Sequence, residues 1–362
     1  MKSEDGWYNK AFSHLYVESA VKNHETTRQI RKHFPDAQIV EIEHYKDLFG
    51  RSRQDFSLQK EHPAFILAKT REHAIYSGAP VCQSFGNVHF YYTSCVMNCI
   101  YDCEYCYLRG MYPSGNIVIF VDIEETFAQV EELLKVHPVY LCVSYDTDLL
   151  ALESLTGFVK KWSAFTRAHE NLTIEIRTKC PNAQIFSTLP SCERVIFAYT
   201  FSPDEIARLC EKRAGTFPAR LSAASEAAKS GHPLRLCIDP ILRVGDWKTA
   251  YRKMIDDIFL KIPPEKILDV SIGTFRISAE YLKKNAKGIT GQQDCAISVC
   301  ERKRLLSISE GRTIGNRADN QTVPFRKNRR VKNIRVERII GEPCEKSFFM
   351  SHVRNQFRLH VR

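Results

Sequence analysis

The feature that most constrains the fold is the regular alternation of short apolar runs with amphipathic helical patterns. Six runs have the length and the β-branched and aromatic content of buried strands: residues 88–95, 139–144, 172–179, 195–202, 234–242 and 267–275. Helical periodicity occupies residues 121–135, 148–165, 221–231 and 247–262. Strands separated by helices pair in parallel through right-handed crossovers. We therefore predict an α/β fold whose six strands form a barrel or partial barrel.

The flanking segments suggest three regions. Apolar runs such as HPAFILAK alternate with polar segments before residue 88, which predicts a small α/β extension over residues 1–87. The predicted barrel covers residues 88–285, with its chemistry on the loops at the carboxyl ends of the strands. Residues 286–362 contain no Tyr or Trp and few periodic runs, so we expect an irregular basic tail.

Charge is concentrated in this tail. Of the net charge of +10, residues 288–362 supply +9, with 16 Lys and Arg against 7 Asp and Glu. Two interpretations remain open: a disordered basic arm that contacts nucleic acid, or an out-of-frame extension of a normal domain.

The composition is that of a globular protein, with 44% hydrophobic and 26% charged residues. No apolar run approaches the roughly 20 residues of a membrane helix, and the N-terminus lacks the apolar core of a signal peptide. We therefore expect a cytoplasmic protein without a membrane partner.

A dense cysteine cluster is the strongest chemical signal. Of 13 cysteines, four fall within twelve residues: Cys95, Cys99, Cys103 and Cys106. The spacing of Cys99-x3-Cys103-x2-Cys106 suits three thiolates that hold a [4Fe-4S] cluster and leave its fourth iron open for a small ligand. A structural zinc site completed by Cys95 is the alternative.

The pattern C-x3-C-x-aromatic-C, with Tyr105 as the aromatic residue, resembles the signature of the radical S-adenosylmethionine superfamily. This resemblance implies a partial (β/α)6 barrel. It also implies that the open iron chelates the amino and carboxylate groups of S-adenosylmethionine, whose reductive cleavage gives a 5′-deoxyadenosyl radical. The protein would then orient, shield and tune this chemistry.

The longer string YDCEYCYLRGMYPSGNIVIFVDIEE resembles the spore photoproduct lyase family, with a match from about residue 50 to residue 285. The resemblance implies a DNA repair lyase that reverses 5-thyminyl-5,6-dihydrothymine to two thymines. The implied partners are DNA that carries this lesion and a one-electron donor such as flavodoxin or ferredoxin. The implied location is the cytoplasm of a spore-forming bacterium, in the spore core.

The same resemblance assigns individual residues. Cys142 would donate hydrogen to the substrate radical, and Tyr105 and Tyr107 would relay hydrogen between it and the cofactor. The residues implied to contact S-adenosylmethionine are Ser144, Lys179, Thr200 and Asp239. The chain departs from the family in three places: YDTD at 145–148 is longer, Asp239 replaces a small residue, and the tail lacks the family's lesion-binding Arg-Tyr pair.

Other interpretations remain open at this point. The chain could be a radical enzyme acting on a peptide or a small metabolite, or an iron-sulfur protein that binds nucleic acid without catalysis. The cysteines without a matching spacing are interpreted as structural or incidental: Cys82, Cys180, Cys192, Cys210, Cys237, Cys295, Cys300 and Cys344.

Overall fold

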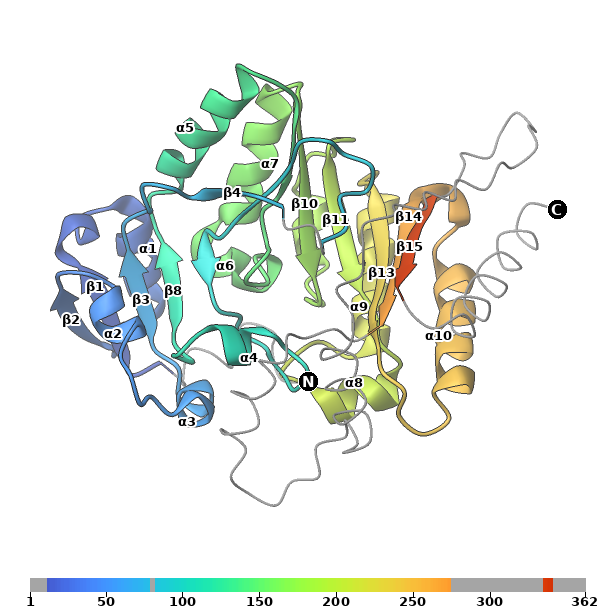
Figure 1. Ribbon diagram of the computed structural model, residues 1–362, viewed down its shortest axis with the longest axis horizontal. Coiled ribbons are helices and arrows are strands. Elements are labelled where there is room, and N and C mark those ends of the chain that lie inside the picture. The colour runs from blue at the N-terminus through green and yellow to red at the C-terminus, as the bar shows by residue number, and fades with distance from the viewer. Residues whose placement is uncertain (1–11, 79–81, 275–334, 341–362) are drawn as a thin grey trace, which may run out of the picture.

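The computed structural model describes residues 12–78, 82–274 and 335–340. Most strands belong to two sheets, which Figure 1 shows beside each other, with the N-terminal sheet at the left. The chain passes between these sheets more than once before residue 121. It forms three strands of the first sheet, then two of the second, and then returns to the first.

The first sheet has five strands in the order β2-β1-β3-β8-β6, and only β6 and β8 pair antiparallel. Its strands are β1 (His14–Glu18), β2 (Gln38–Ile42), β3 (Phe65–Ala68), β6 (Val96–Met97) and β8 (Ile117–Phe120). The helices before β3 are α1 (Glu25–His33), α2 (Lys46–Phe49) and α3 (Phe56–Glu61). Strands β3 and β8 are buried along their whole length, as their uninterrupted apolar sequences FILA and IVIF require.

The second sheet has eight strands in the order β15-β14-β13-β11-β10-β9-β5-β4. Every neighbouring pair is parallel except β4 and β5. Its strands are β4 (Ile75–Ser77), β5 (Phe90–Thr93), β9 (Val139–Cys142), β10 (Leu172–Thr178), β11 (Val195–Thr200), β13 (Leu234–Ile241), β14 (Ile267–Thr274) and β15 (Arg335–Ile340). The α/β class and the parallel pairing of the six predicted strands are thereby confirmed.

Helices separate most of these parallel strands. They are α4 (Leu108–Met111), α5 (Ile123–Leu134), α6 (Glu153–Thr156), α7 (Phe158–Ala168), α8 (Asp204–Cys210), α9 (Phe217–Lys229) and α10 (Trp247–Lys261). A two-stranded antiparallel ribbon joins β7 (Asp102–Cys103) to β12 (Glu211–Lys212). None of the described helices is long and apolar enough to span a bilayer.

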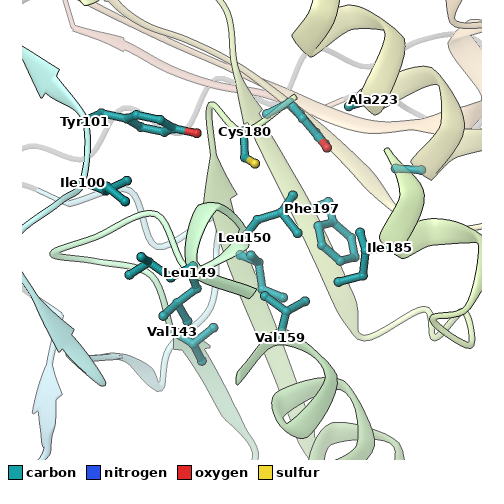
Figure 2. Packing of buried hydrophobic residues seen from close by; sticks show 14 of the residues in the cluster. Ile100, Tyr101, Val143, Leu149, Leu150, Val159, Cys180, Ile185, Phe197 and Ala223 are labelled. Atoms are coloured by element: carbon teal, nitrogen blue, oxygen red, sulfur yellow. The ribbon is translucent and has the colours of Figure 1, made fainter. Parts of the chain in front are cut away.

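One face of the second sheet is apolar and covered by helices. Alternate residues of the central strands are fully buried there, among them Leu141, Ile174, Phe197 and Leu236. Figure 2 shows the ring of Phe197 beside Ile185, and Val143 below Leu149. Tyr101 of the cysteine loop extends its hydroxyl toward Cys180 in the same view, so this loop packs on the edge of the core.

The other face of this sheet is polar, and we call it the polar face. Strand register places its residues together: Tyr140, Cys142, Glu175, Arg177, Thr200, Arg235, Cys237, Asp269 and Ser271. The buried guanidinium of Arg235 pairs with Glu175 and with Asp269. Phe85 covers it, with the guanidinium carbon 3.2 Å from the ring centroid. Charges buried this deeply persist because each has an opposite partner.

Two sequence predictions need correction. The predicted helix over 148–165 is interrupted at Gly157, whose φ of +65° ends α6 before α7 begins, because a left-handed residue cannot continue a right-handed helix. The expectation of an unpatterned tail is wrong for Arg335–Ile340, which form β15 and pair in parallel with β14. This pairing satisfies backbone groups that would otherwise make β14 an open edge. The rest of the tail lies outside the described residues.

Candidate functional site

The cysteine loop lies between β6 and α4, just after the chain has crossed from β5 of the second sheet to β6 of the first. Asn98 opens the loop with φ of +72°, and its side-chain amide donates to the carbonyls of Ser114 (2.7 Å) and Asn116 (2.9 Å). Within the loop β7 pairs with β12, which follows α8. The loop is therefore fixed both to the first sheet and to the segment after β11.

The three cysteines of the C-x3-C-x2-C motif lie near one another. The thiol of Cys103 interacts electrostatically with those of Cys99 and Cys106. Burial raises the pKa of all three thiols, to about 12 for Cys99. Two cationic side chains, Lys60 and Lys179, interact with these thiols and favour their anionic form.

This donor set fits an iron-sulfur cluster. Thiolate is the ligand that such clusters take, and nearby cations offset the negative charge of several thiolates in a buried site. Within the described residues no three His, Cys, Asp or Glu side chains are grouped to hold a single metal ion. Cys95 is directed elsewhere, toward Trp162 and Thr93. Cys95, which the zinc alternative would need as its fourth ligand, therefore has its side-chain partners outside the C-x3-C-x2-C motif.

Lys179 and Tyr105 lie next to the cluster cysteines. The ammonium of Lys179 is 5.6 Å from the centroid of the Tyr105 ring, and the Tyr105 hydroxyl donates to the Glu211 carboxylate. Burial alone would lower the pKa of Lys179, but Cys103 and Glu211 together raise it. Glu211 also forms a fully buried ion pair with Arg220, whose guanidinium donates to the carbonyl of Thr200 at 3.2 Å. The predicted residues Tyr105, Lys179 and Thr200 therefore belong to one connected site.

Cys142 ends β9 and lies on the polar face, directly across from Glu175 in the register of β9 and β10. Burial raises the pKa of the Cys142 thiol, and the neighbouring Glu175 carboxylate adds to this shift. Two residues on, the Ser144 hydroxyl oxygen accepts a hydrogen bond of 2.6 Å from the backbone N–H of Arg177. Ser144 thus helps to join the ends of β9 and β10.

Tyr107 is held on the other side of the loop. Its hydroxyl donates to the carbonyl of Tyr145 at 2.9 Å and to a carboxylate oxygen of Asp146 at 3.4 Å. In the hydrogen bonds of the described residues, neither Tyr105 nor Tyr107 is joined directly to Cys142. Tyr145 is linked to the Cys142 region instead, since its hydroxyl is 3.3 Å from the thiol of Cys82, which interacts electrostatically with the Cys142 thiol.

Asp239 lies in β13, beside Gly273 of β14. A Cβ placed on Gly273 would be 2.7 Å from a carboxylate oxygen of Asp239, so the Asp239 side chain lies directly against the backbone of β14. The carboxylate also interacts electrostatically with Arg177 and Cys237. Asp239 is thus linked to the Cys142 side of the site through Arg177, which interacts with both residues.

Three acidic residues of the site were missed in the sequence. Asp146 accepts hydrogen bonds from Tyr107, Ser94 and Tyr112. Asp148 accepts from the Lys179 backbone N–H at 2.6 Å and from the Thr178 hydroxyl, and Glu211 is the partner of Tyr105. The signal for the first two was the segment YDTD itself, because carboxylates directly after a buried strand fall at the end of the sheet that carries the chemistry.

Comparisons with known proteins agree on one family. A family model described as spore photoproduct lyase matches residues 89–304, more than half of the chain. The spore photoproduct lyase of Bacillus subtilis (strain 168) is 22% identical over 195 residues, which are 53% of this chain. The match spans only 56% of that relative's own length.

Solved structures of similar fold also belong to spore photoproduct lyase. An alanine mutant of that enzyme superimposes with a TM-score of 0.71 at 15% identity and covers 96% of both chains. A second mutant, with bound AdoMet and dinucleoside spore photoproduct, superimposes with a TM-score of 0.66 at 16% identity. It covers 78% of this chain and 84% of that one. At this level of identity the similarity establishes a shared fold.

Proposed function

The chain belongs to the spore photoproduct lyase family, and from this premise we propose that it repairs 5-thyminyl-5,6-dihydrothymine in DNA to two thymines. The observation that carries the proposal is the grouping of the Cys99, Cys103 and Cys106 thiols beside Lys179. A relative of the same fold binds AdoMet and dinucleoside spore photoproduct. We further propose that β5, β9, β10, β11, β13 and β14 make a partial (β/α)6 barrel around the site.

The residues of this chain would hold the cofactors as follows. Cys99, Cys103 and Cys106 bind the [4Fe-4S] cluster, and the Lys179 ammonium pairs with the carboxylate of S-adenosylmethionine. Ser144, Thr200 and Asp239 contribute further contacts at the strand ends, with Asp239 acting through its backbone. When bound, this pair of cofactors supplies reductive cleavage of S-adenosylmethionine and a 5′-deoxyadenosyl radical.

Cys142 acts as the hydrogen-atom donor to the substrate radical in this proposal. Transfer of a hydrogen atom requires the S–H form, and the raised pKa of the Cys142 thiol keeps it protonated near neutral pH. Burial also keeps water away from the sulfur. Tyr105 and Tyr107 would relay hydrogen between Cys142 and the cofactor, and Glu211 and Asp146 accept hydrogen bonds from their two hydroxyl groups.

The proposed substrate is a lesion within DNA, so the linked bases must leave the helical stack to reach the site. Lys and Arg side chains around the site would contact the phosphates. The electron would come from a donor such as flavodoxin or ferredoxin, in the cytoplasm of a spore-forming bacterium. We also retain the division into an extension over 1–87, a catalytic region over 88–285 and a tail over 286–362.

Anaerobic reconstitution with iron and sulfide tests this function. The protein is then incubated with S-adenosylmethionine, dithionite and a dinucleotide that carries the spore photoproduct, and thymine formation is followed by chromatography. We expect repair by the wild type and neither iron binding nor repair by Cys99→Ala. A matched control, Cys192→Ala, removes a cysteine outside the site and should repair normally. Cleavage of S-adenosylmethionine that never yields thymine would contradict the proposed substrate.

A further inference from the structure

A lysine from the N-terminal sheet region is buried against the cysteine loop. Lys60, near the end of α3, is only 4% exposed, and its ammonium donates to the backbone carbonyl of Cys99. The ring of Phe56 is 5.6 Å from the same ammonium. Among the described residues no carboxylate forms an ion pair with Lys60. An ammonium in such a place needs a negative charge nearby.

The position of Lys60 is fixed by the packing of α3. The side-chain oxygen of Gln59 accepts from the backbone N–H of Gly115 (2.8 Å) and from the Ser114 hydroxyl (3.0 Å). The backbone carbonyl of Lys60 accepts from the guanidinium of Arg213 at 2.5 Å. Helix α3 is therefore held by two separate segments, while the Lys60 ammonium reaches the backbone of Cys99.

The charges around Lys60 point to the cluster thiols as its counterion. Burial lowers the pKa of Lys60, whereas the electrostatic partners Cys99, Cys106 and Asp102 raise it and Arg109 lowers it further. Asp102 and Arg109 form an ion pair with each other at 2.5 Å, so their charges largely cancel. Lys179 lies near Cys103 and Cys106 instead and is occupied by Glu211 as well. Lys60 is thus the cation on the Cys99 side of the loop.

We propose that Lys60 is a positioning residue whose fixed positive charge raises the reduction potential of the cluster bound by Cys99, Cys103 and Cys106. The inference rests on the proposed function, since it requires that cluster. One-electron reduction adds one negative charge to the cluster, and a buried cation stabilises the reduced form more than the oxidised form. Lys60 belongs to the N-terminal α/β extension. This extension would therefore influence how readily the cluster accepts an electron.

The test measures a potential and does not depend on turnover. Wild type, Lys60→Met, Lys60→Arg and a control, Lys229→Met, are reconstituted anaerobically. Iron and sulfide are assayed, and each protein is titrated with dithionite under electron paramagnetic resonance without S-adenosylmethionine. Lys229 is the matched control because its side chain is 67% exposed, where solvent screens the lost charge. We expect a more negative potential in Lys60→Met and an unchanged potential in Lys60→Arg and Lys229→Met.

The outcomes separate the inference from the function on which it rests. A loaded Lys60→Met protein with the wild-type potential would overturn the role of Lys60 alone. Loss of iron in Lys60→Met but not in Lys60→Arg would also overturn it, because the charge would then be needed to bind the cluster rather than to set its potential. Loss of iron in both would overturn it, since packing rather than charge would then be required. A wild type that binds no cluster would overturn the proposed function together with this inference.

Discussion

The hydroxyl of Tyr105 donates to the carboxylate of Glu211, a residue 106 positions away in the chain. Glu211 also accepts from the Ser202 hydroxyl at 2.8 Å and pairs with Arg220, and neither member of this ion pair has an exposed side chain. Since Tyr105 lies between two of the cluster cysteines, this carboxylate fixes the cysteine loop against the segment after β11. Positioning of the loop and stability of the core thus depend on the same residue.

Replacing Glu211 should therefore destabilise the protein strongly. Glu211→Gln leaves the buried Arg220 without its counterion, and such a change costs about 3–5 kcal/mol. Urea unfolding at pH 7 measures the loss. The control is Glu226→Gln, whose exposed partner is Lys229 and whose removal should cost at most about 1 kcal/mol. Similar losses in the two variants would show that the Glu211 pair is not structurally important.

Cys142→Ala should separate cofactor cleavage from repair. The variant keeps the cluster cysteines and Lys179, so iron content and cleavage of S-adenosylmethionine should match the wild type. Thymine formation should fall by about tenfold or more, equivalent to at least 1.4 kcal/mol of transition-state stabilisation. Chromatography of products from both variants, with Cys237→Ala as the control on the same face, measures the effect. Normal repair by Cys142→Ala would assign hydrogen donation to another group.

Gly115→Ala should disturb the contact between α3 and the cysteine loop. The new Cβ would be 2.6 Å from the carbonyl oxygen of Phe56 and 3.0 Å from the backbone nitrogen of Lys60. Both are backbone atoms, so α3 must shift, at a cost of about 1–3 kcal/mol. Thermal unfolding of the apoprotein measures this, and Ser57→Ala on the same helix should stay within about 0.5 kcal/mol of the wild type. Equal melting temperatures for the two variants would mean that α3 moves freely.

Glu153 should make stability depend on pH. Burial raises its pKa from 4.5 to about 7, although the backbone N–H groups of Val159 and Lys160 donate to its carboxylate. Because the unfolded chain releases this proton at lower pH than the folded chain, stability falls as pH rises from about 4.5 to about 7. Glu153→Gln cannot ionise, so its stability relative to wild type should rise by about 3 kcal/mol across this window. The control, Glu132→Gln, replaces a 70% exposed carboxylate, and its curve should run parallel to that of the wild type.

The sequence predicted the regular part of the fold because that part depends on local patterns. Apolar runs such as VYLC, which ends at Cys142, and VIFAYT, which precedes Phe201, predict buried strands, and the helices between them impose parallel pairing. The break at Gly157 was missed because the apolar periodicity continues through it. The strand Arg335–Ile340 was missed because it pairs with the edge strand β14. The local sequence of the tail carries no information about that edge.

The same distinction holds for the site. The spacing of Cys99, Cys103 and Cys106 is encoded within eight residues, and the sequence by itself determined that this loop is the chemical centre of the chain. Which charges surround it was decided only by the tertiary structure, since Lys60 and Glu211 are brought to it from 39 and 106 positions away. Local spacing determines how ligands on one loop are arranged. The opposite charges that stabilise a buried charge can come from any part of the chain, so folding decides which residues supply them. Only the packed chain shows where those partners meet.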